Sequence, residues 1–241
     1  MHFYVGLHHP GDGKHFDRAF ISVNAVRRRK APIGARKWIM DSGAFTEISR
    51  HGRYRHSVEE YAEVINRWAS DPTLIAAVAQ DYMCESFILA KTGLSVAEHQ
   101  LLTIERYDAL LALVRNVYVM PVLQGYAPDD YVSHIRQYGD RLAHGAYVGV
   151  GSVCKRNSNP AAIESVLLAI KRERPDLRLH GFGLKVTALG SGVVRDCLYS
   201  ADSMAWSFAA RYEGRNGNDW REAASYVNRV ATQHVQYGFG F

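Results

Sequence analysis

Short apolar runs recur eight times along the chain, and helical periodicity fills most of the intervals between them. The runs span residues 3–7, 20–26, 37–43, 74–81, 117–125, 146–153, 177–184 and 199–206. Near-continuous apolar runs of this length are typical of parallel strands that are buried on both faces. Their alternation with helical segments therefore predicts a series of βα units.

Four of the intervals carry clear helix signals, at residues 57–70, 95–115, 127–139 and 159–173. The first has a capping-box pattern, Ser57 followed by Glu60. The last has Pro160 at the favoured first helical position. In 57–70 a single apolar stripe is formed by Val58, Tyr61, Ala62, Ile65 and Trp68. The connections after the first two runs lack a convincing helix.

Eight strands with intervening helices, in a chain of 241 residues, predict a (β/α)8 TIM-like barrel. We expect a single domain over residues 1–241 with a short C-terminal helix. A doubly wound open sheet is the rival architecture. In either fold the functional side chains belong at the carboxyl ends of the strands, where the βα loops gather.

Composition restricts the compartment and the kinds of binding partner that we expect. Three cysteines, widely spaced and without a C-x-x-C pair, argue against a disulfide framework and against a cysteine-rich zinc site, so we expect a reducing, cytoplasmic compartment. The N-terminal apolar run is too short for a signal peptide or anchor, and no run is long enough to span a membrane. The net charge of +5 permits a polyanionic partner without requiring one.

Polar residues stand at the ends of several predicted strands. They are Asp41, Ser42 and Gly43; Asp81; Gln124 and Gly125; Gly149, Gly151 and Ser152; and Asp202. A single Asp at a strand end is about as often a helix cap as a functional group. Asp202, however, lies inside an apolar run, and Asp41 and Asp81 are not followed immediately by a predicted helix. Three carboxylates at one barrel mouth are costly to bury, which indicates chemistry.

Several reactions could use such carboxylates. The chain has no H-x-H or H-E-x-x-H pattern, so we predict no metal, although His8 and His9 leave a mononuclear site open. No cofactor-binding motif is present. Cleavage of a glycosidic bond fits better, because it needs one carboxylate at the anomeric carbon and another that moves a proton on the leaving group.

The motifs at these positions resemble those of the tRNA-guanine transglycosylases, barrel enzymes that exchange guanine for a deazaguanine base. "MDSGAF" is similar to their D-S-G-G-F motif, and "AAVAQDYMCES" to the strand that ends in a base-reading aspartate. "VMPVLQGYAPDDY", "YVGVGSV" and "YSADSMAW" follow in the family's order. Together the five motifs cover residues 38–206, about two-thirds of the chain.

The resemblance implies roles for these residues. Asp202 would attack the anomeric carbon and form a covalent intermediate, and Asp41 would carry protons to the departing base and from the incoming one. Asp81 and Gln124 would hydrogen-bond the purine edge. Ser42, Gly43, Gly125, Gly149, Gly151 and Ser152 would lie around the base.

The sequence differs from the tRNA enzymes in ways that indicate a different branch of their superfamily. The family's zinc site of clustered cysteines is missing, since only 35 residues follow Trp206 and none is a cysteine. A compact form of this kind looks more like the phage-type DNA 7-deazaguanine transglycosylases, which insert bases such as preQ0 into DNA. The resemblance implies DNA and a free 7-deazaguanine base as partners, with tRNA as the alternative, and allows a phage enzyme acting in the host cytoplasm.

Candidate nucleic-acid contacts are His8, His9, Arg211 and Arg215, with the basic run 27–30 as a further possibility. Two other function classes stay open. One is a barrel glycosidase or N-glycosidase that acts on a small molecule, and the other is a catalytically silent nucleic-acid-binding barrel. The sequence does not indicate an oligomeric state, the inserted base, or a need for partner proteins.

Overall fold

A computed structural model describes residues 1–233 of the chain; the last eight residues of the predicted domain lie outside the described part. Nine strand segments form one parallel sheet in the order β5-β4-β3-β2-β1-β9-β8-β7-β6. Their bounds are β1 His2–Gly6, β2 Arg18–Ser22, β3 Lys37–Asp41, β4 Leu74–Val78, β5 Val119–Met120, β6 Val122–Leu123, β7 Tyr147–Val150, β8 Arg178–Gly181 and β9 Leu198–Ser203.

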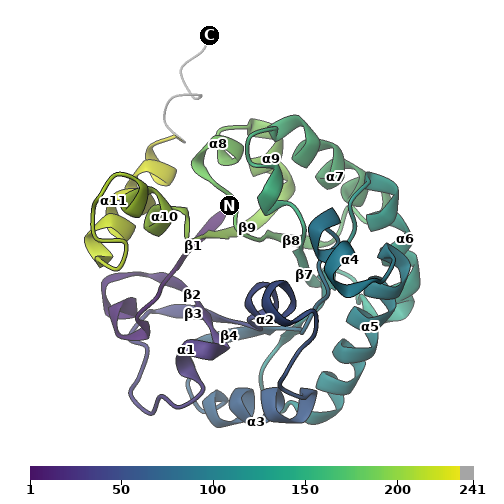
Figure 1. The fold of residues 1–241 in the computed structure, drawn as a ribbon, viewed down its shortest axis with the longest axis horizontal. Coiled ribbons are helices and arrows are strands. Elements are labelled where there is room, and N and C mark those ends of the chain that lie inside the picture. Colours follow the sequence, from purple (N-terminus) through teal and green to yellow (C-terminus); the bar gives the residue numbers. More distant parts are fainter. Residues whose placement is uncertain (234–241) are drawn as a thin grey trace.

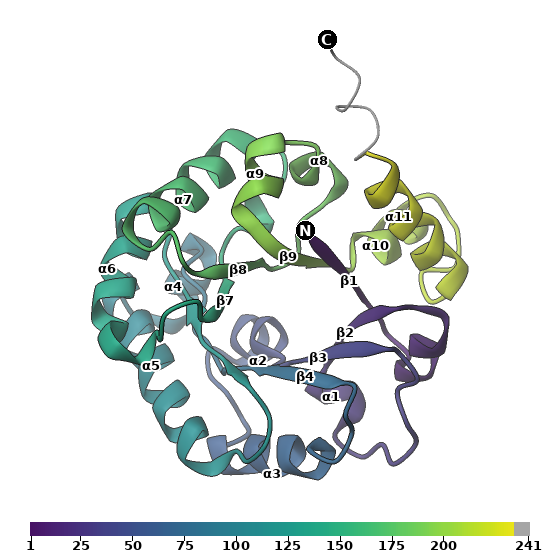
Figure 2. The same ribbon diagram turned by 180° about the vertical axis from the view of Figure 1, so that it is seen from behind.

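The two ends of this sheet meet at Pro121. β5 pairs with β4 and β6 pairs with β7, and only Pro121 separates β5 from β6. Proline has no N–H to donate, so it interrupts one ladder. Its carbonyl still accepts a hydrogen bond of 2.8 Å from the Gly149 N–H. The segment 119–123 is therefore the fifth of eight barrel strands. The predicted barrel is confirmed, and Figures 1 and 2 show the strands as a ring surrounded by helices.

The helices cover the outside of the ring, and several short ones lie in the loops. Their bounds are α1 Val23–Val26, α2 Ala44–His51, α3 Val58–Trp68, α4 Ser86–Thr92, α5 Val96–Leu113, α6 Pro128–Tyr138, α7 Pro160–Glu173, α8 Val186–Leu189, α9 Gly192–Cys197, α10 Ala205–Tyr212 and α11 Trp220–Thr232. Three short 3-10 segments are η1 Pro10–His15, η2 Gly139–Arg141 and η3 Cys154–Arg156. None of the helices within residues 1–233 is both long and apolar enough to cross a membrane.

Two sequence expectations about these elements are wrong in part. The run 20–26 is not one strand, because β2 ends at Ser22 and the Ser22 hydroxyl accepts from the Asn24 N–H to start α1. The last run ends its strand at Ser203, and α10 begins two residues later. In addition, α2 begins only three residues after Asp41, so Asp41 is closer to a helix than expected.

The core has two layers, separated by the sheet. A small cluster fills the barrel interior, and the larger one lies between the strands and the outer helices. Along each strand the side chains alternate between these layers. The interior set is Tyr4, Phe20, Ile39, Ala76, Val78, Met120, Val122 and Tyr147. This alternation decides which polar side chains enter the barrel mouth.

Candidate active site

Strand alternation directs Asp41 and Asp202 into the barrel. Asp41 lies two residues beyond Ile39, an interior residue of β3. Asp202 of β9 is the register partner of Tyr4, another interior residue. Both aspartates stand near the carboxyl ends of their strands. α2, which follows the carboxyl end of β3, lies in front of the ring in Figure 1.

The Asp202 carboxylate is buried and held from one side. Its Oδ1 accepts a hydrogen bond of 3.1 Å from the Gly183 N–H and lies 3.3 Å from His180 Nε2. Because a carboxylate only accepts, His180 Nε2 carries the proton in this contact. His180 Nδ1 in turn lies 2.7 Å from the Ser200 hydroxyl. These contacts fix the orientation of the carboxylate.

Sequence reasoning missed His180. The residue lies within β8, and its side chain is fully buried inside the barrel. The available signal was a lone polar side chain two positions before Phe182, on the interior face of an apolar run. A buried histidine in a strand is normally hydrogen-bonded within the core, so this signal alone does not indicate a site.

Burial raises the pKa of Asp41 to about 6, and the negative charge of Asp202 adds to the rise. A hydrogen bond of 3.2 Å from the Gly43 N–H opposes it. Because the charge of Asp202 affects the pKa of Asp41, the two carboxyl groups lie close enough to interact electrostatically. Next to Asp41, the Ser42 hydroxyl is buried and has no hydrogen-bond partner among the described residues.

A second group of polar side chains lies just after the ends of β4, β6 and β7. Gln124 donates from Nε2 to Asp81 Oδ2, and its Oε1 lies 2.8 Å from the Ser152 hydroxyl. Burial raises the pKa of Asp81 to about 7; the hydrogen bond from Gln124 lowers it and the charge of Asp41 raises it. Asp81, Gln124 and Ser152 are all buried. The sequence-predicted base-reading residues therefore come together.

Glu85 joins this group, although we did not predict it as a site residue. Its side chain is buried, and its Oε2 lies 3.0 Å from the Ser152 hydroxyl. Ser152 has a positive φ of 54°, which is uncommon for a residue other than glycine. This conformation also brings its hydroxyl within 2.8 Å of the Cys84 N–H. Strained backbone of this kind is concentrated at functional sites.

A family model described as DeoxyPurine in DNA protein A, DpdA, matches residues 1–230. The chain belongs to the DpdA family. This family comprises DNA 7-deazaguanine transglycosylases and is related to the tRNA-guanine transglycosylases, so the resemblance seen in the sequence is confirmed. Its members modify guanine in DNA by transglycosylation. No curated protein matches the chain.

The predicted glycines of this DpdA chain have packing roles. A Cβ on Gly151 would lie 2.1 Å from the Gln124 amide, and one on Gly149 would lie 2.4 Å from the Phe182 ring. At Gly125 the nearest atom would be Asp130 Cβ, 2.6 Å away. Gly43 has a φ of 76°, and Asn24 occupies the space beside it. These positions thus require glycine even in the absence of a ligand.

The four predicted DNA contacts differ in their surroundings. His8 Nε2 lies 2.7 Å from the Ser207 hydroxyl, and burial followed by the charge of Arg211 lowers the His8 pKa. His9 and Arg211 are exposed. Arg215 is paired with Glu213 and Glu222. The charge of Arg215 is therefore already compensated, which weakens the case for a phosphate contact there.

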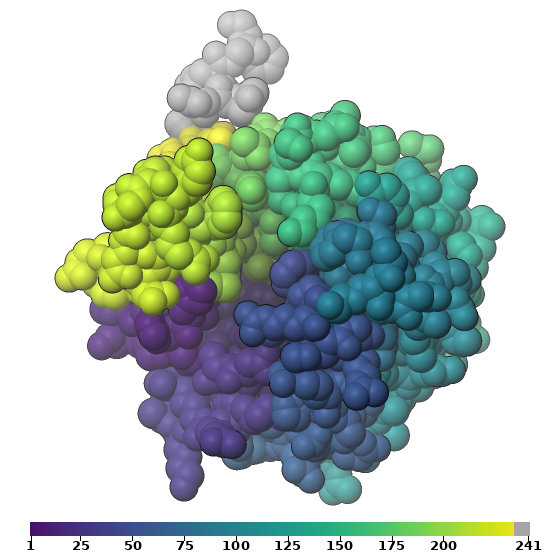
Figure 3. Space-filling model, viewed as in Figure 1, coloured from purple at the N-terminus to yellow at the C-terminus, as the bar shows by residue number. Residues whose placement is uncertain are grey.

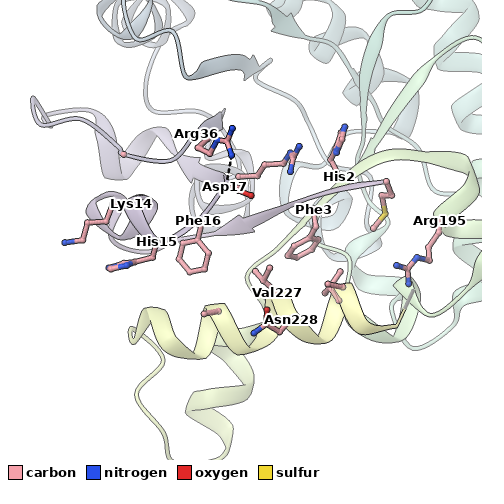
Figure 4. Close-up of a pocket in the computed structure, with 16 residues that line it drawn as sticks. His2, Phe3, Lys14, His15, Phe16, Asp17, Arg36, Arg195, Val227 and Asn228 are labelled. Carbon is pink, nitrogen blue, oxygen red and sulfur yellow. Dashed lines mark ion pairs between the residues drawn. The ribbon is translucent and has the colours of Figure 1, made fainter. Parts of the chain in front are cut away.

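No cluster of three or more His, Cys, Asp or Glu side chains suited to a metal ion occurs in the described part of the DpdA chain. A cavity of about 640 Å³ lies away from the candidate site, between the start of β1, residues 14–18 and α11 (Figure 4). Its carboxylate Asp17 is paired with Arg36 at 3.8 Å. None of the site residues predicted from the sequence lines it.

Proposed function

We propose that this protein exchanges guanine in DNA for a free 7-deazaguanine derivative such as preQ0, through a covalent aspartyl-glycosyl intermediate on Asp202. The observation that carries the proposal is the pairing of two unlike carboxyl groups at one barrel mouth. Asp202 is held by N–H donors, whereas Asp41 has a pKa raised to about 6. Two carboxyl groups in different environments suit one nucleophile and one proton carrier.

The orientation of Asp202 supports its role as the nucleophile. His180 and Gly183 both contact Oδ1, and Oδ2 has no hydrogen bond within residues 1–233. Asp202 Oδ2 attacks C1′ of the deoxyribose, the C1′–N9 bond breaks, and its electron pair stays on the departing guanine. His180 acts as a positioning residue, because it holds Oδ1 while Oδ2 reacts.

Asp41 supplies and then removes one proton. In its protonated form it donates to the departing guanine, and the resulting carboxylate accepts the proton from the ring nitrogen of the incoming base. The new C1′–N bond forms as the ester to Asp202 breaks, so the configuration is retained after two displacements. A pKa of about 6 keeps both forms of Asp41 accessible near neutral pH.

The group around Asp81 suits recognition of a purine edge. Guanine and its 7-deaza derivatives present N–H donors at N1 and N2, which match a carboxylate acceptor. Gln124 occupies Asp81 Oδ2, which leaves Oδ1 for the base. The buried Ser42 hydroxyl, which has no partner among the described residues, is a further candidate contact. A buried polar group left without a partner is costly, so the correct base is favoured over bases that lack the matching donors.

The test supplies radiolabelled preQ0 or guanine together with DNA, tRNA or free deoxyguanosine. We expect label in DNA, and we expect a covalent protein–DNA adduct when the incoming base is withheld. Asp202→Asn should abolish both. Asp196→Asn is the matched control, because Asp196 is an exposed aspartate only six residues away. Label in none of the substrates, or full exchange by Asp202→Asn, would overturn the proposal.

A further inference from the structure

Exposed aromatic side chains stand beside cations in the loops around the barrel mouth. Lys155 Nζ lies 5.0 Å from the centre of the Phe45 ring and 5.8 Å from that of Phe87. Phe45 opens α2 after β3, Phe87 lies in α4 after β4, and Lys155 lies in η3 after β7. Three separate βα loops thus build one aromatic and cationic cluster. Each of the two phenylalanines is 46% exposed.

Two more pairs of the same kind lie on this face. The Arg156 guanidinium is 4.3 Å from the centre of the Tyr126 ring, and Lys185 Nζ is 5.8 Å from that of Phe208. Tyr126 is 52% and Phe208 63% exposed. We call these seven residues the rim: Phe45, Phe87, Tyr126, Lys155, Arg156, Lys185 and Phe208. In the space-filling view the same face is hollowed near its centre, between α2 and α10 (Figure 3).

The rim cations carry uncompensated charge. In the part of the chain that the structure describes, Lys155, Arg156 and Lys185 form no ion pair with a carboxylate. Arg215, by contrast, is held by two glutamates. The rim cations are therefore better suited to phosphates than Arg215 is.

The exposed rings distinguish between two forms of DNA. A duplex presents phosphates and groove edges, while its base faces are stacked inside, so it offers nothing for an exposed ring to cover. An unpaired strand presents the base faces as well, and proteins that bind single strands combine a basic surface with aromatic side chains on which bases stack. Half-exposed rings next to unpaired cations match this second pattern.

We propose that the rim is a single-strand platform, so that the DNA substrate is one in which the target guanine and its neighbours are unpaired. This inference rests on the proposed base exchange. Bases next to the target stack on Phe45 and Phe87 on one side and on Phe208 on the other, while Lys155, Arg156 and Lys185 contact the phosphates between them. Unpaired DNA also avoids the cost of extracting guanine from a base pair.

The test compares a fluorescently labelled single-stranded oligonucleotide containing one central guanine with its duplex, in binding and in base exchange. We expect the single strand to bind and react at least about 10-fold better. Phe45→Ala and Phe208→Ala should each weaken single-strand binding on the order of 10-fold and leave duplex binding unchanged. Leu111→Ala is the control, because Leu111 is 46% exposed on the outer helix α5.

Salt dependence tests the cations separately. For a single strand, Lys155→Gln should reduce the slope of log Kd against log salt by about 0.7, the value for one lost phosphate contact. Arg172→Gln, an exposed arginine at the end of α7, should leave it unchanged. Circular dichroism melts verify that each variant is folded.

Binding measured with Asp202→Asn separates this inference from the proposed reaction. If Asp202→Asn still binds the single strand, and Phe45→Ala or Phe208→Ala weakens that binding, the single-strand proposal is supported whichever residue is the nucleophile. The single-strand proposal would be overturned if the protein bound the duplex more tightly than the single strand. It would also be overturned if the phenylalanine variants lost affinity equally for both forms of DNA. Neither result would contradict the proposed base exchange.

Discussion

Asp41, Asp81 and Asp202 bring three carboxyl groups to one barrel mouth, and Glu85 adds a fourth. In the described chain none of them pairs with a lysine or arginine; Asp202 has His180 instead. Burial without a cation disfavours the charged form, which is why the pKa values of Asp41 and Asp81 rise to about 6 and about 7. Such groups change protonation near neutral pH, as proton transfer requires.

Asp81 should make stability depend on pH. Its pKa of about 7 in the folded chain exceeds the ordinary 3.8, so the folded state binds the proton more tightly than the unfolded state. The stabilisation is complete below pH 4 and is lost as the pH rises to about 7. Asp81→Asn should therefore be more stable than the wild type at pH 8.5, by at most about 4 kcal/mol, and equally stable near pH 4.

Urea unfolding at pH 4, 6 and 8.5 measures this difference. Asp140→Asn serves as the control for an aspartate substitution, because Asp140 is exposed. A stability difference for Asp81→Asn that stays constant with pH would contradict the assignment.

Asp41 should control the pH dependence of adduct formation. In single turnovers without incoming base, the rate should fall as the pH rises through about 6, because only protonated Asp41 can protonate the departing guanine. Asp41→Asn should slow this step by about 100-fold or more and remove the inflection near pH 6. A second inflection, from Asp81, should persist but move below pH 7, because the charge of Asp41 contributes to the raised pKa of Asp81. Denaturing gels of rapidly quenched reactions measure the rates, and an unchanged inflection near pH 6 in Asp41→Asn would exclude the role.

At the residue scale the sequence predicted the strand-end part of the site and missed the part inside the barrel. Asp41, Asp81 and Asp202 interrupt apolar runs, and that is visible without coordinates. His180 acquires its contact with Asp202 from the pairing of β8 with β9. The contact of Glu85 with Ser152 joins loops 67 residues apart. Contacts of this kind depend on register and on loop conformation, which the local pattern does not contain.

At the element scale, two long outer helices with complete capping boxes were predicted, whereas three short helices at the barrel mouth without side-chain caps were not. α3 and α5 begin with complete capping boxes, Ser57 with Glu60 and Ser95 with Glu98. α2, α4 and α10 have no side-chain cap, and all three lie in the loops around the mouth. Tertiary contacts, and not local signals, determine where they start. The elements that carry the rim were therefore those hardest to predict.

The junction between β6 and α6 gives a prediction at this scale. An added Cβ on Gly125 would overlap Asp130, whose carboxylate accepts from the Tyr126 and Ala127 N–H groups at the start of α6. Gly125→Ala should therefore cost about 1–3 kcal/mol of stability. Because Gln124 is adjacent, it should also slow base exchange.

Gly192→Ala is the control for Gly125→Ala. Nothing lies within 4 Å of an added Cβ on Gly192, so this change should be neutral or stabilise by up to about 1 kcal/mol. Thermal melts of the two variants measure this difference. Equal melting temperatures would contradict the prediction, because they would mean that a methyl group on residue 125 fits beside Asp130 without cost.

At the scale of the whole molecule, the rhythm of apolar runs was sufficient to predict the barrel, because eight buried parallel strands have few ways to avoid free edges. Pairing of β1 with β9 joins the first strand to the last, and the segment around Pro121 closes the ring. The ring brings Asp41 and Asp202, which are far apart in the sequence, to the same mouth. Asp41 and Asp202 can therefore act on the same substrate only when the barrel is closed.

Closure predicts that the chain unfolds as one unit, as a single domain should. Strands β1 to β4 form one half of the barrel and β7 to β9 the other. The halves are joined directly by the pairing of β1 with β9, and through the segment 119–123 by the pairing of β5 with β4 and of β6 with β7. Neither half has a closed sheet without the other, so we expect them to unfold together. Hydrogen exchange measured by mass spectrometry at increasing urea should give the same midpoint for peptides that cover β3 and β9. Leu198→Ala, which truncates a buried side chain of β9, should lower both midpoints together. A lower midpoint for β9 alone would mean that the halves are separate folding units and that Asp202 can leave the mouth while Asp41 stays in place.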